Sequence, residues 1–228
     1  MTNAEFLKWF AQWKDVVTTA VAVAAIIVVV LQIRQAGRFE RHRLRRERLA
    51  ARATLPLTLA ALNEYGRGMM QALAPIEAWF EQDGHDEIPT FKGPEVRSQT
   101  IAAAEKAIAA YPEDNVAKSM AAILGSIQIL QSRSQSFYDP HELRTWKMAM
   151  SDNILMAASI IACCENLFPF AREGSDFARP SRSHIAQVLS RERIHQAQYL
   201  GVWKQIVQFS EEEPDINKSS WRRFLKKF

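Results

Sequence analysis

The sequence predicts an all-α protein in which a single N-terminal transmembrane helix is followed by a cytoplasmic bundle of four or five helices. Three observations support this prediction: an uncharged apolar run of 18 residues, an arginine-rich stretch directly after it, and helical spacing of apolar residues in each long stretch beyond. There is no strand-like alternation, internal repeat or low-complexity segment. A chain of 228 residues has room for one span and one domain of ordinary size.

The first 33 residues read as a leader and a membrane span. Residues 1–15 place aromatic side chains at i, i+3, i+4 and i+7, which predicts an amphipathic helix at the membrane interface, with Trp9 and Trp13 in contact with lipid. Residues 16–33, VVTTAVAVAAIIVVVLQI, carry no charge and would rise about 27 Å as a helix, close to the hydrocarbon thickness of a bilayer. We therefore expect residues 16–33 to cross the membrane.

A cleaved secretory signal is the alternative interpretation of this segment. Such a signal has a net positive start and a small-x-small cleavage site, whereas residues 1–15 are neutral and the apolar run ends in LQIRQAGR. An uncleaved anchor is therefore favoured. Thr18 with Ala22, and Ala20 with Ala24, form small-xxx-small pairs through which two anchors could approach closely, so a homo-oligomer formed through the anchor is an open possibility.

Residues 34–52 are expected to form a juxtamembrane helix on the cytoplasmic side. They contain eight Arg and two Glu, whereas residues 1–33 contain two basic residues. This bias places the N-terminus outside and the C-terminal domain in the cytoplasm, at the inner membrane if the protein is bacterial. The adjacent Cys163 and Cys164 provide no disulfide framework, which fits a reducing compartment. Contact with anionic lipids is predicted for six arginines: Arg34, Arg38, Arg41, Arg43, Arg45 and Arg46.

Residues 53–213 are predicted to form an acidic helical bundle. A first apolar stripe is interrupted by Pro75, which should kink or end the helix, and a loop rich in Gly, Asp and Pro follows from Asp83 to Pro94. Further helices are expected over 95–111 and from about Asp114, with a polar connector from Ser132 to Tyr138. The first stripe consists of Leu55, Leu59, Leu62, Tyr65, Met69, Leu73, Ile76 and Phe80, and the stripe of the helix after Asp114 of Val116, Met120, Ile123, Ile127 and Leu130.

The sequence Asp139-Pro140-His141-Glu142 is the clearest helix start, because Asp can cap, Pro suits the first turn and Glu can reach back to the cap. That helix should run to Phe168 and stop at Pro169. A last long helix is expected from Ser181 to Phe209.

The charge distribution argues against nucleic acid as a partner. The pI of 9.2 comes from short basic segments, because residues 53–217 hold 14 basic and 21 acidic side chains, a net charge of −7. A nucleic-acid-binding domain usually carries its basic surface on the folded domain itself. We therefore expect a lipid bilayer and an unidentified protein as partners.

No motif supports catalysis, so we expect no enzymatic activity, cofactor or metal. The glycines form no phosphate-binding loop, and the sequence contains neither GxSxG nor HExxH. Glu192 and His195 form one ExxH pair, but a di-iron site in a helical bundle needs two such pairs and two more Glu. We interpret this pair as polar neighbours on the core face of the last helix.

Residues 214–228 form a basic amphipathic tail. In WRRFLKKF the apolar side chains fall at i, i+3, i+4 and i+7, which predicts an interfacial helix on the cytoplasmic leaflet. The residues expected at the membrane are Trp221, Arg222, Arg223, Phe224, Leu225, Lys226, Lys227 and Phe228.

The function predicted from these features is positional: a membrane-anchored interaction or regulatory protein that presents a cytoplasmic domain at the membrane face. One alternative is a membrane-perturbing effector, of a toxin or phage-defence kind, whose anchors oligomerise. A second alternative, a membrane-bound metalloenzyme, depends on Glu192 and His195 alone.

Overall fold

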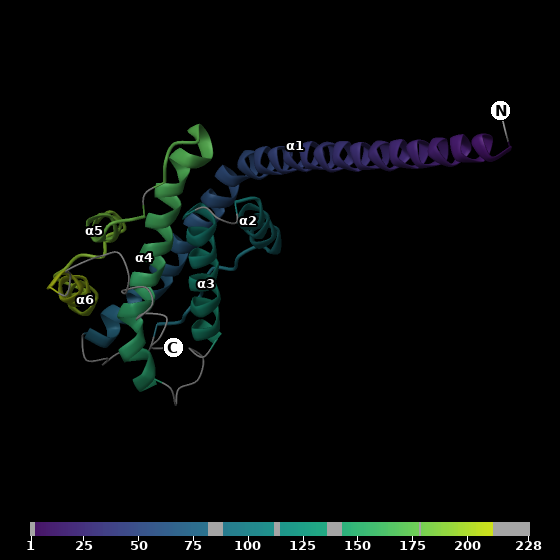
Figure 1. Cartoon of the computed structure of the whole chain (residues 1–228). Coiled ribbons are helices and arrows are strands. Elements are labelled where there is room, and N and C mark those ends of the chain that lie inside the picture. Colours follow the sequence, from purple (N-terminus) through teal and green to yellow (C-terminus); the bar gives the residue numbers. More distant parts are fainter. Residues whose placement is uncertain (1–2, 82–88, 112–114, 136–142, 178, 212–228) are drawn as a thin grey trace. The chain divides into compact units, whose positions relative to one another are not determined.

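The computed structural model describes residues 3–81, 89–111, 115–135, 143–177 and 179–211, with side chains from Trp13 onward except at 15, 143–148 and 208–211. Figure 1 shows the chain. No strand occurs in these ranges, so the predicted all-α class is confirmed for them. The helices are α1 (Asn3–Glu81), α2 (Ser98–Ala110), α3 (Asn115–Gln135), α4 (Leu143–Glu173), α5 (Arg182–Arg191) and α6 (Leu200–Glu211).

The chain divides into two units, Met1–Leu49 and Ala50–Phe228. In the first unit, the predicted span and the predicted arginine-rich helix are continuous parts of α1. Every side chain from 16 to 49 is exposed. The most apolar 18-residue window of the stretch Val16–Glu81 has a mean hydropathy of 2.7 and is 0% buried, which makes the N-terminal part of α1 a candidate membrane span by length and composition.

The second unit is built on residues 50–81 of α1. All eight residues of the predicted first stripe are buried, with exposed fractions of 8% or less, which confirms that stripe. Of the two outcomes expected at Pro75, a kink or an end, the helix does not end there, because α1 continues to Glu81. Ile76 and Phe80 remain in the core beyond Pro75, and their burial offsets the backbone hydrogen bond that proline cannot make.

The other helices of the second unit are connected by direct contacts: α2 with α3, α3 with α4, and α4 with both α5 and α6 (Figure 1). The predicted stripe of α3 is entirely buried. Helix α4 also packs against α1 at Gly66, where an added Cβ would lie 2.8 Å from Ile161 Cγ1. The absence of a side chain at Gly66 therefore permits the close approach of α1 and α4.

Two predicted helix ends are wrong. The expected connector begins at Ser132, but α3 continues to Gln135. The expected stop at Pro169 lies inside α4, which continues to Glu173 and ends at Gly174, with φ of 73°. Gly174 N donates to Phe170 O over 2.9 Å, so this left-handed residue closes the helix where a side chain would be strained. The predicted cap at Asp139 lies outside the described residues.

The predicted helix from Ser181 to Phe209 is also wrong, because two helices, α5 and α6, occupy this region with a loop between them. Arg193 has φ of 64°, a left-handed conformation that an α-helix does not accept. The loop places Ile194 in the core, 3% exposed, and Trp203 Nε1 donates to the Ile194 carbonyl over 2.9 Å. Burial of Ile194 and this hydrogen bond stabilise the loop between α5 and α6. The second unit therefore contains more helices than the predicted four or five.

Candidate functional site

The residues predicted to contact the membrane lie partly inside the described region. Trp13 is 53% exposed, and the six predicted arginines are all exposed on α1. The side chain of Trp9 and the whole tail from Trp221 to Phe228 lie outside the described residues, so the predictions for them stay predictions. The described part of this candidate site is therefore the surface of α1 from Trp13 to Leu49.

Arg43 is neutralised by acidic residues of its own helix. Its Nε lies 2.9 Å from Glu47 Oε1 and its Nη1 lies 3.9 Å from Glu40 Oε2. The hydrogen bond and charge of Glu47, with the charge of Glu40, raise the pKa of Arg43. Arg43 is thus committed to an intrahelical network on the surface.

Most of the other arginines share one face of α1, a pattern that the sequence analysis missed. Their spacing alternates between four and three residues, which at 3.6 residues per turn keeps them within an arc of about 80°. We call the members in the first unit the arginine seam. It consists of Arg34, Arg38, Arg41, Arg45 and Arg48.

Arg52 continues the spacing of the seam but belongs to the second unit. Its guanidinium donates to the Ala171 carbonyl over 3.4 Å and to the Arg172 carbonyl over 3.1 Å. These carbonyls belong to the last turn of α4, where the helix dipole is negative. Arg52 is therefore a clamp on the C-terminus of α4.

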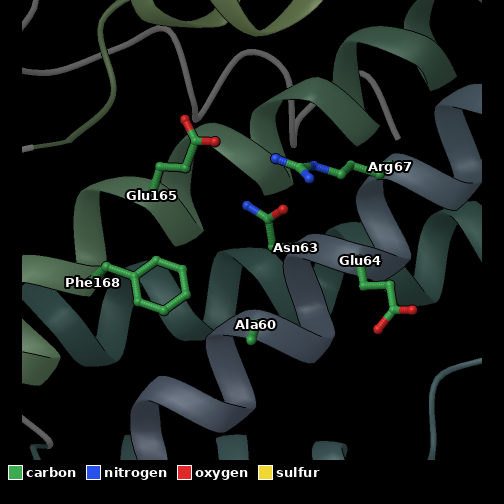
Figure 2. A pocket seen from close by; sticks show the side chains of 6 residues that line it. All are labelled: Ala60, Asn63, Glu64, Arg67, Glu165 and Phe168. Atoms are coloured by element: carbon green, nitrogen blue, oxygen red, sulfur yellow. The ribbon is translucent and has the colours of Figure 1, made fainter. Parts of the chain in front are cut away.

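A groove of about 530 Å³ lies between α1 and α4 (Figure 2). Arg67 and Asn63 point toward one another, whereas Glu64 points away from both. Glu165 accepts a hydrogen bond from Arg191. His184 Nε2 lies 2.9 Å from Glu165 Oε2 and donates a second hydrogen bond when that nitrogen carries a proton. The groove is lined by Ala60, Asn63, Glu64, Arg67, Glu165 and Phe168.

The structure places the predicted pair Glu192 and His195 differently from the prediction. Glu192 follows the last residue of α5 and is ion-paired with Arg67 over 3.2 Å and with Arg191 over 3.7 Å. His195 lies in the exposed loop before α6. The placement of both residues on the core face of one helix is wrong, because the helix ends before Glu192. Arg67 is instead paired with Glu192, and Glu165 with Arg191, which favours a structural role for these side chains.

A second polar cluster, which the sequence analysis missed, joins α1, α4 and α6. Glu77 is 3% exposed and accepts a hydrogen bond from Ser151 Oγ. Glu81 accepts the backbone N–H groups of Leu200, over 3.3 Å, and Gly201, over 3.0 Å. The carboxylate of Glu81 thus caps the start of α6, and the acidic spacing of four residues on α1 was the available signal.

The two cysteines are free and buried in the core. Burial raises the pKa of Cys163 to about 12 and raises that of Cys164 well above the usual value. Both thiols are therefore neutral at physiological pH and poor nucleophiles. Among the described residues, no group of three or more His, Cys, Asp or Glu side chains is arranged to hold a metal ion.

Comparisons with known proteins provide no family for this chain: no protein-family model, no curated protein and no solved structure matches it.

Proposed function

We propose that this protein is a single-pass membrane protein that binds or regulates another protein, and that its second unit forms one helical domain on the cytoplasmic side. The observation that carries this proposal is the uncharged, fully exposed stretch 16–33 of α1, followed within the same helix by eight arginines between residues 34 and 52. Lipid offers no hydrogen-bond partners to the backbone, so a spanning segment must pair its own N–H and C=O groups, as a helix does.

The second unit supports a binding role because it has its own core. Its core combines residues of all six helices, so the unit has the packed interior of a folded domain. A folded domain held beside a membrane acts at a raised local concentration on partners in the same membrane, without chemistry of its own.

Membrane extraction combined with topology reporters tests this proposal. The full chain should stay in the membrane after alkaline carbonate washing. A reporter after Phe228 should read as cytoplasmic and one at the N-terminus as external, because the arginines follow the span. Release by carbonate, or the reverse reporter pattern, would contradict the proposal. Loss of membrane potential on induced expression would instead support the membrane-perturbing effector.

A further inference from the structure

We propose that the arginine seam is a docking surface for an acidic helix of a partner protein. The inference deepens the proposed function, because it depends on the anchor for the position of the seam and names the class of partner. The partner helix would carry Glu or Asp at alternating spacings of three and four residues along one face.

The seam is an exposed row of positive charge without acidic residues on its own face. Glu40 and Glu47 lie on the opposite side of the helix, where they pair with Arg43. In the part of the chain that the structure describes, no ion pair is found for Arg34, Arg38, Arg41 or Arg45, and all four are exposed. The charge of these four guanidinium groups is therefore accessible to an anionic partner.

The length of the seam exceeds what a bilayer surface can contact. A helix leaving the membrane rises about 1.5 Å per residue, so Arg41 lies about 12 Å and Arg45 about 18 Å beyond Ile33. The headgroup layer is about 5–8 Å thick on each side, and surface charge is screened within about 8 Å at physiological ionic strength. The charge of the lipid headgroups therefore reaches Arg34, Arg38 and Arg41, whereas Arg45, at about 18 Å, lies beyond it.

The spacing of the seam favours a helix as that partner. Alternating steps of four and three residues are the period at which two helices keep one contact line along their length. Nucleic acid is disfavoured because a nucleic-acid-binding protein usually carries its basic surface on the folded domain, and residues 53–217 have a net charge of −7. A second seam would repel the first. The densest acidic run of the chain, residues 211–213 and 215, contains Pro214 and, as a helix, would cover only about 7 Å.

The test measures binding of a designed peptide to the full chain in nanodiscs of neutral phosphatidylcholine. The probe is a fluorescent 21-residue helical peptide with Glu at every a and d position, and its control has the same composition with Glu spread around the helix. Two protein variants are matched in charge: Arg41→Gln with Arg45→Gln on the seam, and Arg43→Gln with Arg46→Gln off it. Fluorescence anisotropy gives the affinities.

The aligned peptide should bind the unaltered protein more tightly than the control peptide. The seam variant should weaken this binding about tenfold, the scale of two well-placed exposed ion pairs, and the off-seam variant by less than about threefold. Equal losses in the two variants, equal binding of both peptides, or no binding in discs that hold the protein would overturn the proposal. The proposal would also be overturned if the seam variant changed peptide affinity only in discs that contain phosphatidylserine, because that result would assign the seam to lipid. Because the protein is already in the disc, each of these failures leaves the anchor intact.

Discussion

Two apolar helical stretches of this protein pass the same length and composition test for a membrane span. One is the N-terminal stretch of α1, whose most apolar window has a mean hydropathy of 2.7 and is 0% buried. The other is Ala149–Glu173 of α4, whose window has a mean hydropathy of 1.7 and is 61% buried. Most of the apolar stretch of α4 is therefore covered by the other helices of the second unit, whereas residues 16–33 are exposed. Hydropathy alone therefore identifies both helices, and burial distinguishes the core helix from the candidate span.

The polar side chains of the two stretches differ in the same way. Thr18 in the N-terminal stretch donates to the Lys14 carbonyl of its own helix. In α4, Ser151 bonds to Glu77 of α1, and Asn153 accepts from Arg133 Nη1 of α3 over 2.7 Å. A helix surrounded by lipid must satisfy its polar groups internally, but a core helix can use its neighbours.

The largest expected effect comes from placing a charge in the core helix. Ile161 is fully buried, so Ile161→Asp should reduce the free energy of unfolding by roughly 4 kcal/mol or more, because the carboxylate finds no partner. Denaturant unfolding of the full chain in detergent, followed by Trp fluorescence, measures this. Leu57→Asp is the control: Leu57 is 77% exposed in the same unit and its change should stay within about 0.5 kcal/mol. Equal effects would mean that α4 is not a core helix.

A smaller effect is expected at the contact of α1 with α4. Gly66→Ala should cost roughly 1–3 kcal/mol, because its Cβ would meet Ile161 Cγ1 at 2.8 Å and the Ala157 carbonyl at 3.2 Å. Gly125→Ala should instead stabilise by up to about 1 kcal/mol, since nothing lies within 4 Å and alanine favours helix. The same unfolding experiment compares them, and stabilisation by both would contradict this close contact.

Substitution of Arg52 tests whether this residue belongs to the second unit. Arg52→Gln removes the hydrogen bonds to the Ala171 and Arg172 carbonyls and should cost roughly 1–2 kcal/mol of the unfolding free energy. Arg46→Gln removes the same charge from the first unit and should leave that energy unchanged. Comparable losses in the two variants would show that the effect is one of net charge.

The smallest effect is a pH dependence from the cysteines. The pKa of Cys163 rises from 9.0 to about 12 through burial, so above pH 9 the unfolded chain releases a proton that the folded chain keeps. Stability is fully present below pH 9 and falls as pH rises toward 12. Each thiol should contribute less than about 1 kcal/mol to the fall up to pH 9.5. Cys163→Ala should flatten the profile between pH 8 and 9.5, and an unchanged slope would place Cys163 outside the core.

Apolar periodicity was sufficient to predict the buried faces of α1 and α3, because a helix must bury its stripe wherever it packs. The proline rule failed to predict the end of α4, which continues beyond Pro169. That rule is local, whereas the burial of residues beyond a proline is tertiary. The division between α5 and α6 escaped for a related reason: Ile194 fits a helical pattern and a buried loop equally well. Gly201 and the polar run from Ser190 to Gln198 were the available signals. The pairing of Arg67 with Glu192 could not be predicted, because it joins residues 125 positions apart in the sequence.

The contact of Gly66 with Ile161 also fixes an order of events during synthesis. These residues are 95 positions apart, so at 5–20 residues per second the buried face of α1 waits roughly 5–20 s for its partner to be made. In the proposed topology, residues 16–33 are already in the membrane during that time, with the stripe from Leu55 to Phe80 still unpacked. Arg67 and Glu77 lie among these apolar residues and Glu81 follows them directly, so the charges make the stripe a poor substrate for insertion. The three charges that form ion pairs and hydrogen bonds in the folded unit thus also disfavour insertion of the second half of α1 before its partners are made.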